Sequence, residues 1–514
     1  MENRLVSVLE LGSTGIRLTV AQIRNGGQWE VMDRAGRPVA LGRDVFNSGE
    51  LSRESLLECL SVLENFRELL SGWGIVPADV HSIATSALRV ARNRDIFIDR
   101  IRQETGFNLS VVDGIEENRL MYLAVRFALK EDLPLFWRTN SMILEVGGGS
   151  TEVMLLRQGQ MAAVHSIRLG TILIDQRMQL RAGPGFFSER YLRDAVRNTM
   201  GLLNAEMDMA NVRTLVMAGS DARLASAKVG SELNEHCRRI SREDFIAFAE
   251  KIRDYSIEDC INKLGISYSN AEGFVPGFLV LKLFLEQTGA AQVVVPLVSI
   301  REGYLIDLAL GSDPVLREEF HKEFHSQIIA SAASLGRKYN SDEAHSQHVA
   351  SLCMILFDAL AKEHGMNRRQ RMMLETAAIL HDIGTIIKSS GHHKHGHYIV
   401  SNSEIFGLSN DELNIIANVV RYHRGDPPAE SDIEYVSLQR EERILVLKMA
   451  SILRVADALD RGHSQKIKNL AVERRTSTVA LHAAGVYDLS LELLSLEEKA
   501  DLFQDVFGYK VVLT

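Results

Sequence analysis

One pattern occurs twice in the first third of the chain: an apolar strand ending in a glutamate, a short loop of small residues, and a second strand. The first copy places Glu10 before the Gly12–Gly15 loop, and the second places Glu145 before the Gly147–Thr151 loop. The two glutamates stand 135 positions apart, a separation typical of duplicated domains and too long for a solenoid repeat. The repeat therefore predicts two related α/β domains, each opening with a hairpin.

Strand-like and helical patterns alternate up to about residue 310, and long amphipathic helices dominate afterwards. Histidine usage changes at the same point, because 13 of the 16 histidines follow position 311. We predict two α/β domains at 1–130 and 131–310, an all-α domain at 311–470 and a small mixed subdomain at 471–514. The expected helices of the α/β part span 51–73, 95–105, 116–130, 188–211 and 276–288.

Composition limits the kinds of partner and compartment. The formal charge of −9 predicts that the chain repels nucleic acid duplexes, so a polyanionic ligand needs a locally basic cleft. The four cysteines are widely separated and form no CxxC pair, which favours a reducing compartment. The N-terminal segment is too short and acidic for a signal peptide, and no apolar run is long enough for a membrane span. We expect a soluble cytoplasmic protein.

The two loops have the composition of phosphate-binding loops. Glycine lets backbone N–H groups converge on an anion, and Ser or Thr hydroxyls add donors. A single loop of this kind is commonly just a hairpin turn, whereas two equivalent loops beside carboxylates favour phosphate binding. The candidate phosphate ligands are Ser13, Thr14, Gly147, Gly148, Gly149, Ser150 and Thr151.

Paired loops on duplicated α/β domains resemble the phosphate clamps of the sugar kinase, heat-shock ATPase and actin superfamily. This resemblance implies two actin-like (RNase H-like) domains and leaves the reaction open. An actin-like kinase would also need an acceptor site. The all-α domain and the small mixed subdomain would follow this pair.

Three further stretches resemble the exopolyphosphatase and guanosine-pentaphosphate phosphatase family: residues 84–94, residues 113–120, and Val275–Gly277 followed by Arg301–Gly303. The resemblance implies a phosphoanhydride hydrolase that releases terminal phosphate from inorganic polyphosphate, with guanosine pentaphosphate as the alternative substrate. It also implies Mg²⁺ or Mn²⁺ as cofactor and a homodimer.

The same resemblance assigns roles to individual residues. Glu117 stands at the position of the catalytic glutamate that orients and deprotonates water, although the Glu116–Glu117 pair is also typical of an acidic helix start. Arg89 is a candidate phosphate ligand, whereas Arg301 is expected to be structural or peripheral. The third phosphate motif would contribute Gly219 and Ser220, and the metal would lie near Glu10, Glu145 or Glu152.

Several positions depart from the family pattern. Aspartate is usual where this chain has Glu10 and Glu145, asparagine is usual at Thr14, and an acidic residue is usual at Leu297. Asp221 adds a carboxylate to the third phosphate motif. Longer carboxylate side chains alter the geometry around a metal. A non-catalytic sensor of polyphosphate or of the guanosine alarmone is therefore an alternative to the enzyme.

The histidine-rich part resembles the HD phosphohydrolase superfamily. The resemblance implies a second divalent metal held by His345, His381, Asp382, His395, His423 and Asp457. Imidazole and carboxylate ligands on neighbouring helices can enclose an ion and activate its water. The sequence leaves open whether His348 replaces His345, which of the four histidines at 392–397 faces inward, and whether this domain is catalytic or a dimer scaffold.

Overall fold

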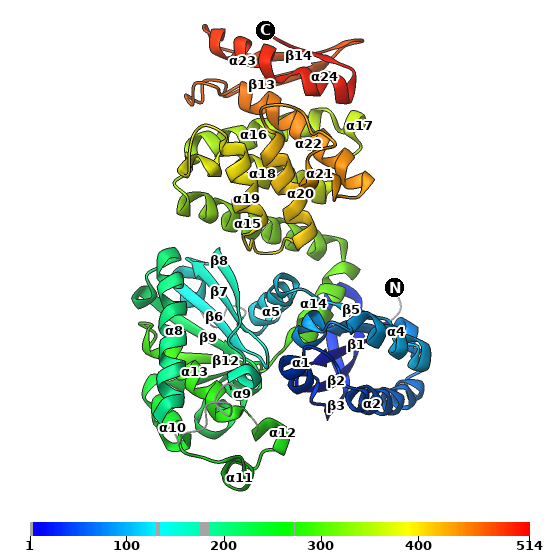
Figure 1. Cartoon of the computed structure of the whole chain (residues 1–514), viewed down its shortest axis with the longest axis vertical. Coiled ribbons are helices and arrows are strands. Elements are labelled where there is room, and N and C mark those ends of the chain that lie inside the picture. Colours follow the sequence, from blue (N-terminus) through cyan, green and yellow to red (C-terminus); the bar gives the residue numbers. More distant parts are fainter. Residues whose placement is uncertain (1–3, 130–133, 175–185, 272) are drawn as a thin grey trace. The chain divides into compact units, whose positions relative to one another are not determined.

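The computed structural model describes residues 4–129, 134–174, 186–271 and 273–514 (Figure 1). Its contacts divide the chain into two units, residues 1–324 and 325–514, and the division falls inside the long helix α15 (Pro314–Lys338). The four predicted domain ranges stay predictions, and the one expected boundary at 130/131 touches residues outside the described ranges. No described helix combines the length and the apolar character that a bilayer span requires.

The first sheet of unit one has the strand order β3-β2-β1-β4-β5. The hairpin of β1 (Arg4–Gly12) and β2 (Gly15–Ile23) closes with Gly12 opposite Gly15, and β1 pairs in parallel with β4 (His81–Ala84). The remaining strands are β3 (Trp29–Pro38) and β5 (Leu109–Val111). Its helices are α1 (Leu41–Ser48), α2 (Arg53–Gly72), α3 (Ser86–Val90), α4 (Arg94–Thr105) and α5 (Gly114–Leu129).

The second sheet repeats this arrangement and extends it, with the order β10-β11-β12-β9-β6-β7-β8. The hairpin of β6 (Asn140–Val146) and β7 (Thr151–Arg157) places Glu145 opposite Glu152, and β6 pairs in parallel with β9 (Val212–Ala218). The other strands are β8 (Gln160–Ile167), β10 (Ser231–Asn234), β11 (Cys237–Ser241) and β12 (Gln292–Pro296). Both predicted hairpins and the predicted duplication are confirmed.

Separate apolar cores stabilise the two sheets, and one helix returns to connect them. The second sheet packs against α8 (Phe186–Glu206), α9 (Ser220–Val229), α10 (Arg242–Ile252) and α13 (Phe274–Glu286). The shorter helices are α6 (Pro134–Arg138), α11 (Ile257–Asp259) and α12 (Tyr268–Ala271). Helix α14 (Ile300–Ser312) then packs Leu305 and Ala309 on Val6, Val8 and Ala21 of the first sheet. The chain thus ends unit one on the sheet where it began.

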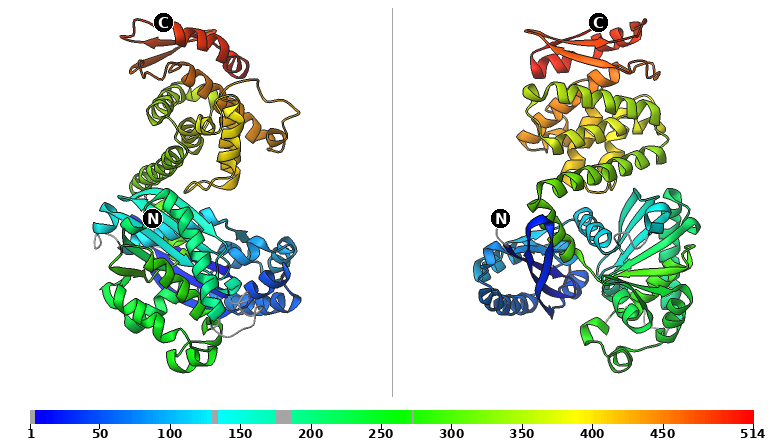
Figure 2. Two further views of the ribbon diagram at one scale, coloured as in Figure 1. Left: turned by 60° about the vertical axis from the view of Figure 1, so that its left-hand side comes forward. Right: turned by 180° about the vertical axis from the view of Figure 1, so that it is seen from behind.

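Unit two is a helical domain followed by a three-stranded sheet (Figure 2). Its helices after α15 are α16 (Glu343–Ala359), α17 (Ala361–His364), α18 (Arg368–Leu380), α19 (His392–Ser401), α20 (Asn410–Tyr422), α21 (Ile433–Val436) and α22 (Arg440–Ala458). The sheet joins β13 (Leu470–Arg474), β14 (Thr478–Ala483) and β15 (Lys510–Leu513), with α23 (Ser490–Lys499) and α24 (Asp501–Phe507) between the last two strands. The predicted fold class, two actin-like sheets followed by a helical region, is confirmed.

Candidate functional site

One cavity in unit one is lined by both glycine-rich loops and encloses about 120 Å³. Its charged lining consists of Glu10, Glu117, Glu145, Glu152, Asp221, Arg17, Arg223 and Arg301. The predicted phosphate ligands that also line it are Ser13, Thr14, Gly147, Gly148, Ser150, Gly219 and Ser220. All four glutamates singled out in the sequence therefore surround one space, although their α-carbons come from three separate stretches of the chain.

The two glycine-rich loops lie against each other. A Cβ atom added to Gly148 would stand 2.9 Å from Cβ of Ser13, which is closer than van der Waals contact allows. Ser13 is buried and its hydroxyl is 2.8 Å from the hydroxyl of Ser86, at the start of α3. The absence of a side chain at Gly148 is thus what lets the two loops pack this closely.

Three of the predicted phosphate ligands occupy other positions. Gly149 faces the ring of Phe46, where an added Cβ would meet Cζ at 2.3 Å. Thr151 is buried, and its hydroxyl donates a hydrogen bond to the carbonyl oxygen of Leu169. Arg89 reaches the site indirectly, through the carboxylate of Glu117. Among the described residues, none of the three lines the cavity.

The structure separates the roles of the two adjacent acids at the start of α5. Asp113 caps the helix by accepting a hydrogen bond of 2.8 Å from the N–H of Glu116. The Glu116 carboxylate pairs with Arg119 at 2.7 Å, whereas Glu117 lines the cavity. The capping of α5 and the ion pair with Arg119 are therefore supplied by Asp113 and Glu116, and neither task involves Glu117.

Glu117 is held by Arg89 and is poised between its two protonation states. Arg89 Nη1 donates hydrogen bonds to Glu117 Oε2 at 3.0 Å and to the carbonyl oxygen of Val112 at 3.1 Å. Burial and the nearby charge of Glu152 raise the pKa of Glu117 to about 7, while Arg89 opposes that rise. A carboxyl group with this pKa can act as a base near neutral pH.

Glu10 and Glu152 are already engaged by the protein. Glu10 forms an ion pair with Arg301 and lies 3.9 Å from Arg17. Glu152 accepts hydrogen bonds from Ser150 at 2.8 Å, Ser166 at 2.7 Å and Asn118 at 3.0 Å. Both carboxylates therefore hold the loops and helices of the cavity in place.

The Glu145 carboxylate has no hydrogen bond or ion pair among the described residues, although it lines the cavity. Burial and the charge of Glu117 raise its pKa to about 8, and Arg223 lowers it in part. Asp221 behaves similarly, because burial raises its pKa to about 7 against the hydrogen bond from Ser220. A cation or a proton placed among these acids would reduce the cost of burying their negative charges.

Glu145 is the carboxylate of this cavity that could hold a magnesium ion together with phosphate oxygens. Mg²⁺ is usually bound by one or two carboxylates together with substrate phosphates and water, without a complete protein cage. The cavity acids do not form a preassembled three-ligand group within the described residues. The Glu145 carboxylate, which has no hydrogen-bond or ion-pair partner among them, is the ligand that the predicted set of Glu10, Glu145 and Glu152 leaves available.

The segment Arg301–Gly303 contributes more than the sequence indicated. Arg301 reaches Glu10 in the cavity, so its side chain is part of the site rather than peripheral. Glu302 caps α14 by accepting hydrogen bonds from the N–H and hydroxyl of Ser299, and Gly303 lies so close to α5 that an added Cβ would be 2.0 Å from the carbonyl oxygen of Leu120. Arg301 thus lines the cavity, Glu302 caps α14, and Gly303 lets α14 pack closely against α5.

Arg223 was not identified from the sequence. It lies one helical turn after Gly219, on α9, and donates a hydrogen bond of 3.2 Å to the carbonyl oxygen of Val298. Gly219 has a φ of +96° at the start of this helix, and a Cβ there would be 3.6 Å from Cγ of Glu145. The first turn of α9, with its positive dipole end, thus joins the cavity.

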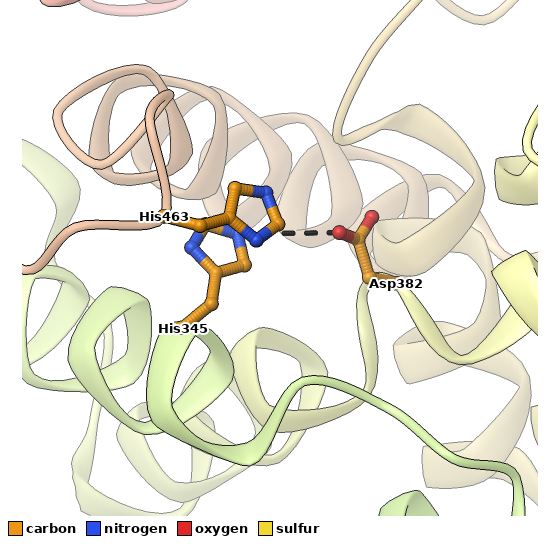
Figure 3. A group of neighbouring side chains, drawn as sticks. All are labelled: His345, Asp382 and His463. Atoms are coloured by element: carbon orange, nitrogen blue, oxygen red, sulfur yellow. Dashed lines mark ion pairs between the residues drawn. The ribbon is translucent and has the colours of Figure 1, made fainter.

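A second concentration of functional side chains lies in unit two. His345 on α16, His381 at the end of α18 and Asp457 on α22 form one group. Asp382 lies beside it, with Oδ2 4.0 Å from Nε2 of His345 (Figure 3) and 3.6 Å from Nε2 of His381. Asp382 is also 3.0 Å from Nε2 of His392, the first residue of α19. The structure brings five of the six predicted ligands together.

The inward-facing histidine of the 392–397 cluster is His392. It groups with Asp382 and His423, whereas His395 belongs to none of the metal-ligand groups among the described residues. His348 also lies outside these groups, whereas His345 belongs to two of them. Of these two histidines, His345 is therefore the candidate ligand. Burial opposes the charge of Asp382, but His381, His392 and His423 hold its pKa well below the usual range.

Comparisons with known proteins agree with this architecture. The Ppx/GppA phosphatase family matches residues 19–311, and domain III of that family matches residues 329–500. A Photobacterium profundum protein named guanosine-5'-triphosphate,3'-diphosphate pyrophosphatase is 23% identical over 99% of this chain and 98% of its own length. A protein of the same name from Vibrio atlanticus is 22% identical over 98% and 97%.

Solved structures share the fold. An exopolyphosphatase from Cytophaga hutchinsonii superposes with a TM-score of 0.54 at 19% identity, covering 60% of this chain and 99% of that one. The Aquifex aeolicus member of the Ppx/GppA family gives a TM-score of 0.50 at 22% identity, covering 61% and 99%. The chain is therefore a hydrolase of the Ppx/GppA phosphatase family and carries that family's domain III.

Proposed function

We propose that the cavity of unit one hydrolyses the terminal phosphoanhydride of guanosine pentaphosphate, with inorganic polyphosphate as a second substrate. The observation that carries the proposal is the position of Glu117, half-buried beside Arg89 in a cavity lined by both glycine-rich loops. The relatives that match over the whole chain carry a name that specifies a guanosine triphosphate diphosphate, which favours the pentaphosphate.

Glu117 is the proposed general base. Arg89 binds its Oε2 atom, and Oε1 has no hydrogen-bond partner among the described residues, so one oxygen remains for a water molecule. A pKa of about 7 makes the carboxylate basic enough to accept a proton and still largely ionised above neutral pH. In-line attack of that water on the terminal phosphorus breaks the anhydride bond and releases orthophosphate.

The phosphate chain would be held by the loop N–H groups, the first turn of α9 and the cavity arginines. These fixed donors compensate the charge that develops on the phosphoryl oxygens. Five carboxylates face three arginines in the lining, so the cavity needs additional positive charge before a polyanion enters. Bound Mg²⁺, held by Glu145, would supply that charge and neutralise the phosphate oxygens.

The test measures phosphate release from guanosine pentaphosphate and from long-chain polyphosphate, with Mg²⁺ or Mn²⁺. Glu117→Gln should lower kcat by about 10²–10⁴-fold, the usual contribution of a general base. The matched control is Glu116→Gln, because Glu116 is adjacent but pairs with Arg119 instead of entering the cavity. The control should stay within a few-fold of the wild type.

Three outcomes separate the alternatives. Equal rates for wild type and Glu117→Gln would refute the proposed base. Loss of activity in Asp382→Asn but not in Glu117→Gln would move the chemistry to unit two. Tight binding of either substrate without turnover by the wild type would identify a sensor. The ratio of kcat/KM for the two substrates decides which of them is preferred.

A further inference from the structure

One carboxylate of the cavity in unit one, that of Asp221, has no part in the proposed chemistry. It lies in the first turn of α9, directly after Gly219 and Ser220, the two predicted phosphate ligands of that segment. Its Oδ2 atom faces the start of α13, because a Cβ added to Gly277 would stand 2.7 Å from it. The hydroxyl of Ser220 donates a hydrogen bond of 3.2 Å to the other oxygen, Oδ1. Among the described residues, Oδ2 has no hydrogen-bond donor.

Asp221 and Glu117 belong to opposite walls of the cavity. Glu117 is held by Arg89 of α3, which packs in the core of the first sheet. Asp221 lies between α9 and α13, which pack in the core of the second sheet. Glu117 raises the pKa of Glu145, and Arg223 lowers the pKa of both Glu145 and Asp221. A phosphate chain that ends at Glu117 therefore passes Glu145 and Arg223 before it reaches Asp221.

The wall that holds Asp221 is also where the cavity meets solvent. Among the described residues that line the cavity, the two that are exposed are Ser220, next to Asp221, and Asn270, at the end of α12. Glu152, whose charge acts on Glu117, is buried. The part of a substrate that extends beyond the bound phosphates therefore leaves the cavity past Asp221.

A carboxylate at this place treats the two proposed substrates differently. A long inorganic chain continues with further phosphates, so it brings negative charge next to Asp221, and like charges repel. In guanosine pentaphosphate the 5' chain continues into a ribose and a guanine, which offer hydroxyl, N1–H and N2–H donors. An ionised carboxylate only accepts hydrogen bonds, so it can bind these donors but not phosphate oxygens. Specificity often depends on such a repulsive group.

We infer that Asp221 is a specificity-determining residue, which disfavours long inorganic phosphate chains and favours a phosphate chain that ends in a nucleoside. The inference rests on the proposed function, because it concerns the substrate of the same cavity. The carboxylate accepts a hydrogen bond from the ribose or the guanine at the place where an inorganic chain would put another phosphate. Gly219, Ser220 and Arg223 remain available for the phosphates themselves.

The test compares kcat/KM for guanosine pentaphosphate and for long-chain polyphosphate, with Mg²⁺. Burial raises the pKa of Asp221 to about 7, so the assay is run at pH 8, where the carboxylate is ionised. Asp221→Asn keeps the shape of the side chain and removes its charge. The ratio of kcat/KM for the pentaphosphate to that for polyphosphate should fall about tenfold or more, which corresponds to about 1.4 kcal/mol. An unchanged ratio, or a wild type that prefers polyphosphate, would overturn the inference.

Two further variants separate charge at this place from a structural effect on α9. An acid in the first turn of a helix also stabilises the helix through its dipole. Glu243→Gln removes such an acid from the first turn of α10, outside the cavity, and should leave the ratio unchanged. Asp221→Glu keeps the charge and should keep the preference of the wild type within about threefold. Loss of the preference in Asp221→Glu would contradict a role for the charge.

Inorganic chains of increasing length locate the effect. Chains too short to reach Asp221 should be cleaved equally well by the wild type and by Asp221→Asn, and the variant should be faster only above a threshold length. A gain that is the same at every length would assign the effect to the total charge of the cavity and overturn the inference. A wild type that releases no phosphate from either substrate would refute the proposed function as well, whereas activity on both with an unchanged ratio in Asp221→Asn would refute this inference alone.

Discussion

At the scale of single residues, the site of unit one depends on how burial and charge tune carboxyl groups. Glu116 and Glu117 are neighbours in sequence, yet one is neutralised by Arg119 and the other lies among further acids. Arg89 is the nearest compensation for Glu117, at 3.0 Å. The basicity of the proposed catalytic group is therefore set by one arginine that does not itself line the cavity.

Replacing Arg89 should change the pH dependence of catalysis. Arg89 lowers the pKa of Glu117 against the effect of burial, so Arg89→Met should raise that pKa above about 7. The acidic limb of the kcat/KM profile should then move to higher pH, and the rate at pH 7 should fall by about tenfold or more, since one pKa unit corresponds to tenfold in the ionised fraction. Arg92→Met, which removes an exposed arginine paired with Glu50, should leave the profile in place.

Glu145 makes stability depend on pH in the opposite direction from an ordinary ion-paired acid. Its folded pKa of about 8 exceeds the ordinary 4.5, so the folded state keeps a proton that the unfolded state releases. Stability is then lost as pH rises from about 4.5 to 8. Without divalent ions, Glu145→Gln should raise the thermal midpoint by a few degrees, and by more at pH 8 than at pH 5. If the thermal midpoints of Glu145→Gln and the wild type differ by the same amount at both pH values, this prediction is refuted.

At the scale of elements, the cavity depends on the contact between α5 and α14. Glu117 lies in the first turn of α5 and Arg301 in the first turn of α14, and Gly303 is where the two backbones approach most closely in the contacts described above. The distance between Glu117 and Arg301 therefore depends on Gly303, a residue that has no side chain.

Gly303→Ala should force these helices apart. Its Cβ would be 2.0 Å from a backbone oxygen, and such overpacking typically costs about 1–3 kcal/mol. Denaturant unfolding should show this loss, and phosphate release should fall as well. Gly311→Ala is the matched control on α14, since an added Cβ there meets no atom within 4 Å and alanine favours helix. Equal stability of the two variants would argue against close packing at Gly303.

The sequence predicted the hairpins because their signals are local: strand, small residues, strand. It did not place Arg301, because its approach to Glu10 depends on α14 returning to the first sheet after 291 residues. It favoured His395 over His392 by its place in the stretch that resembles the HD superfamily. Residues three apart share a helix face, so periodicity could not choose between them. Thr151 was assigned to the loop, although its hydroxyl turns to Leu169 where β7 begins.

At the scale of the whole molecule, two units with separate cores should not unfold as one. Chains of several domains commonly depart from two-state behaviour, and a ligand stabilises only the part that binds it. Calorimetry should resolve two transitions, and Zn²⁺, which imidazole ligands bind well, should raise the one assigned to residues 325–514. Asp382→Asn should remove this shift, whereas Glu117→Gln should retain it. A single transition in every sample would contradict this independence.

The ion pair between Glu10 and Arg301 has a consequence for product release. If Arg301 binds a phosphate oxygen, as the proposed function requires of the cavity arginines, the incoming anion has to displace the Glu10 carboxylate from it. A long phosphate chain that also contacts both loops would compensate this exchange through many simultaneous contacts, whereas a single orthophosphate would not. We expect the pair to re-form after each cleavage and to return Arg301 to Glu10, so that the enzyme is only weakly inhibited by the orthophosphate that it releases.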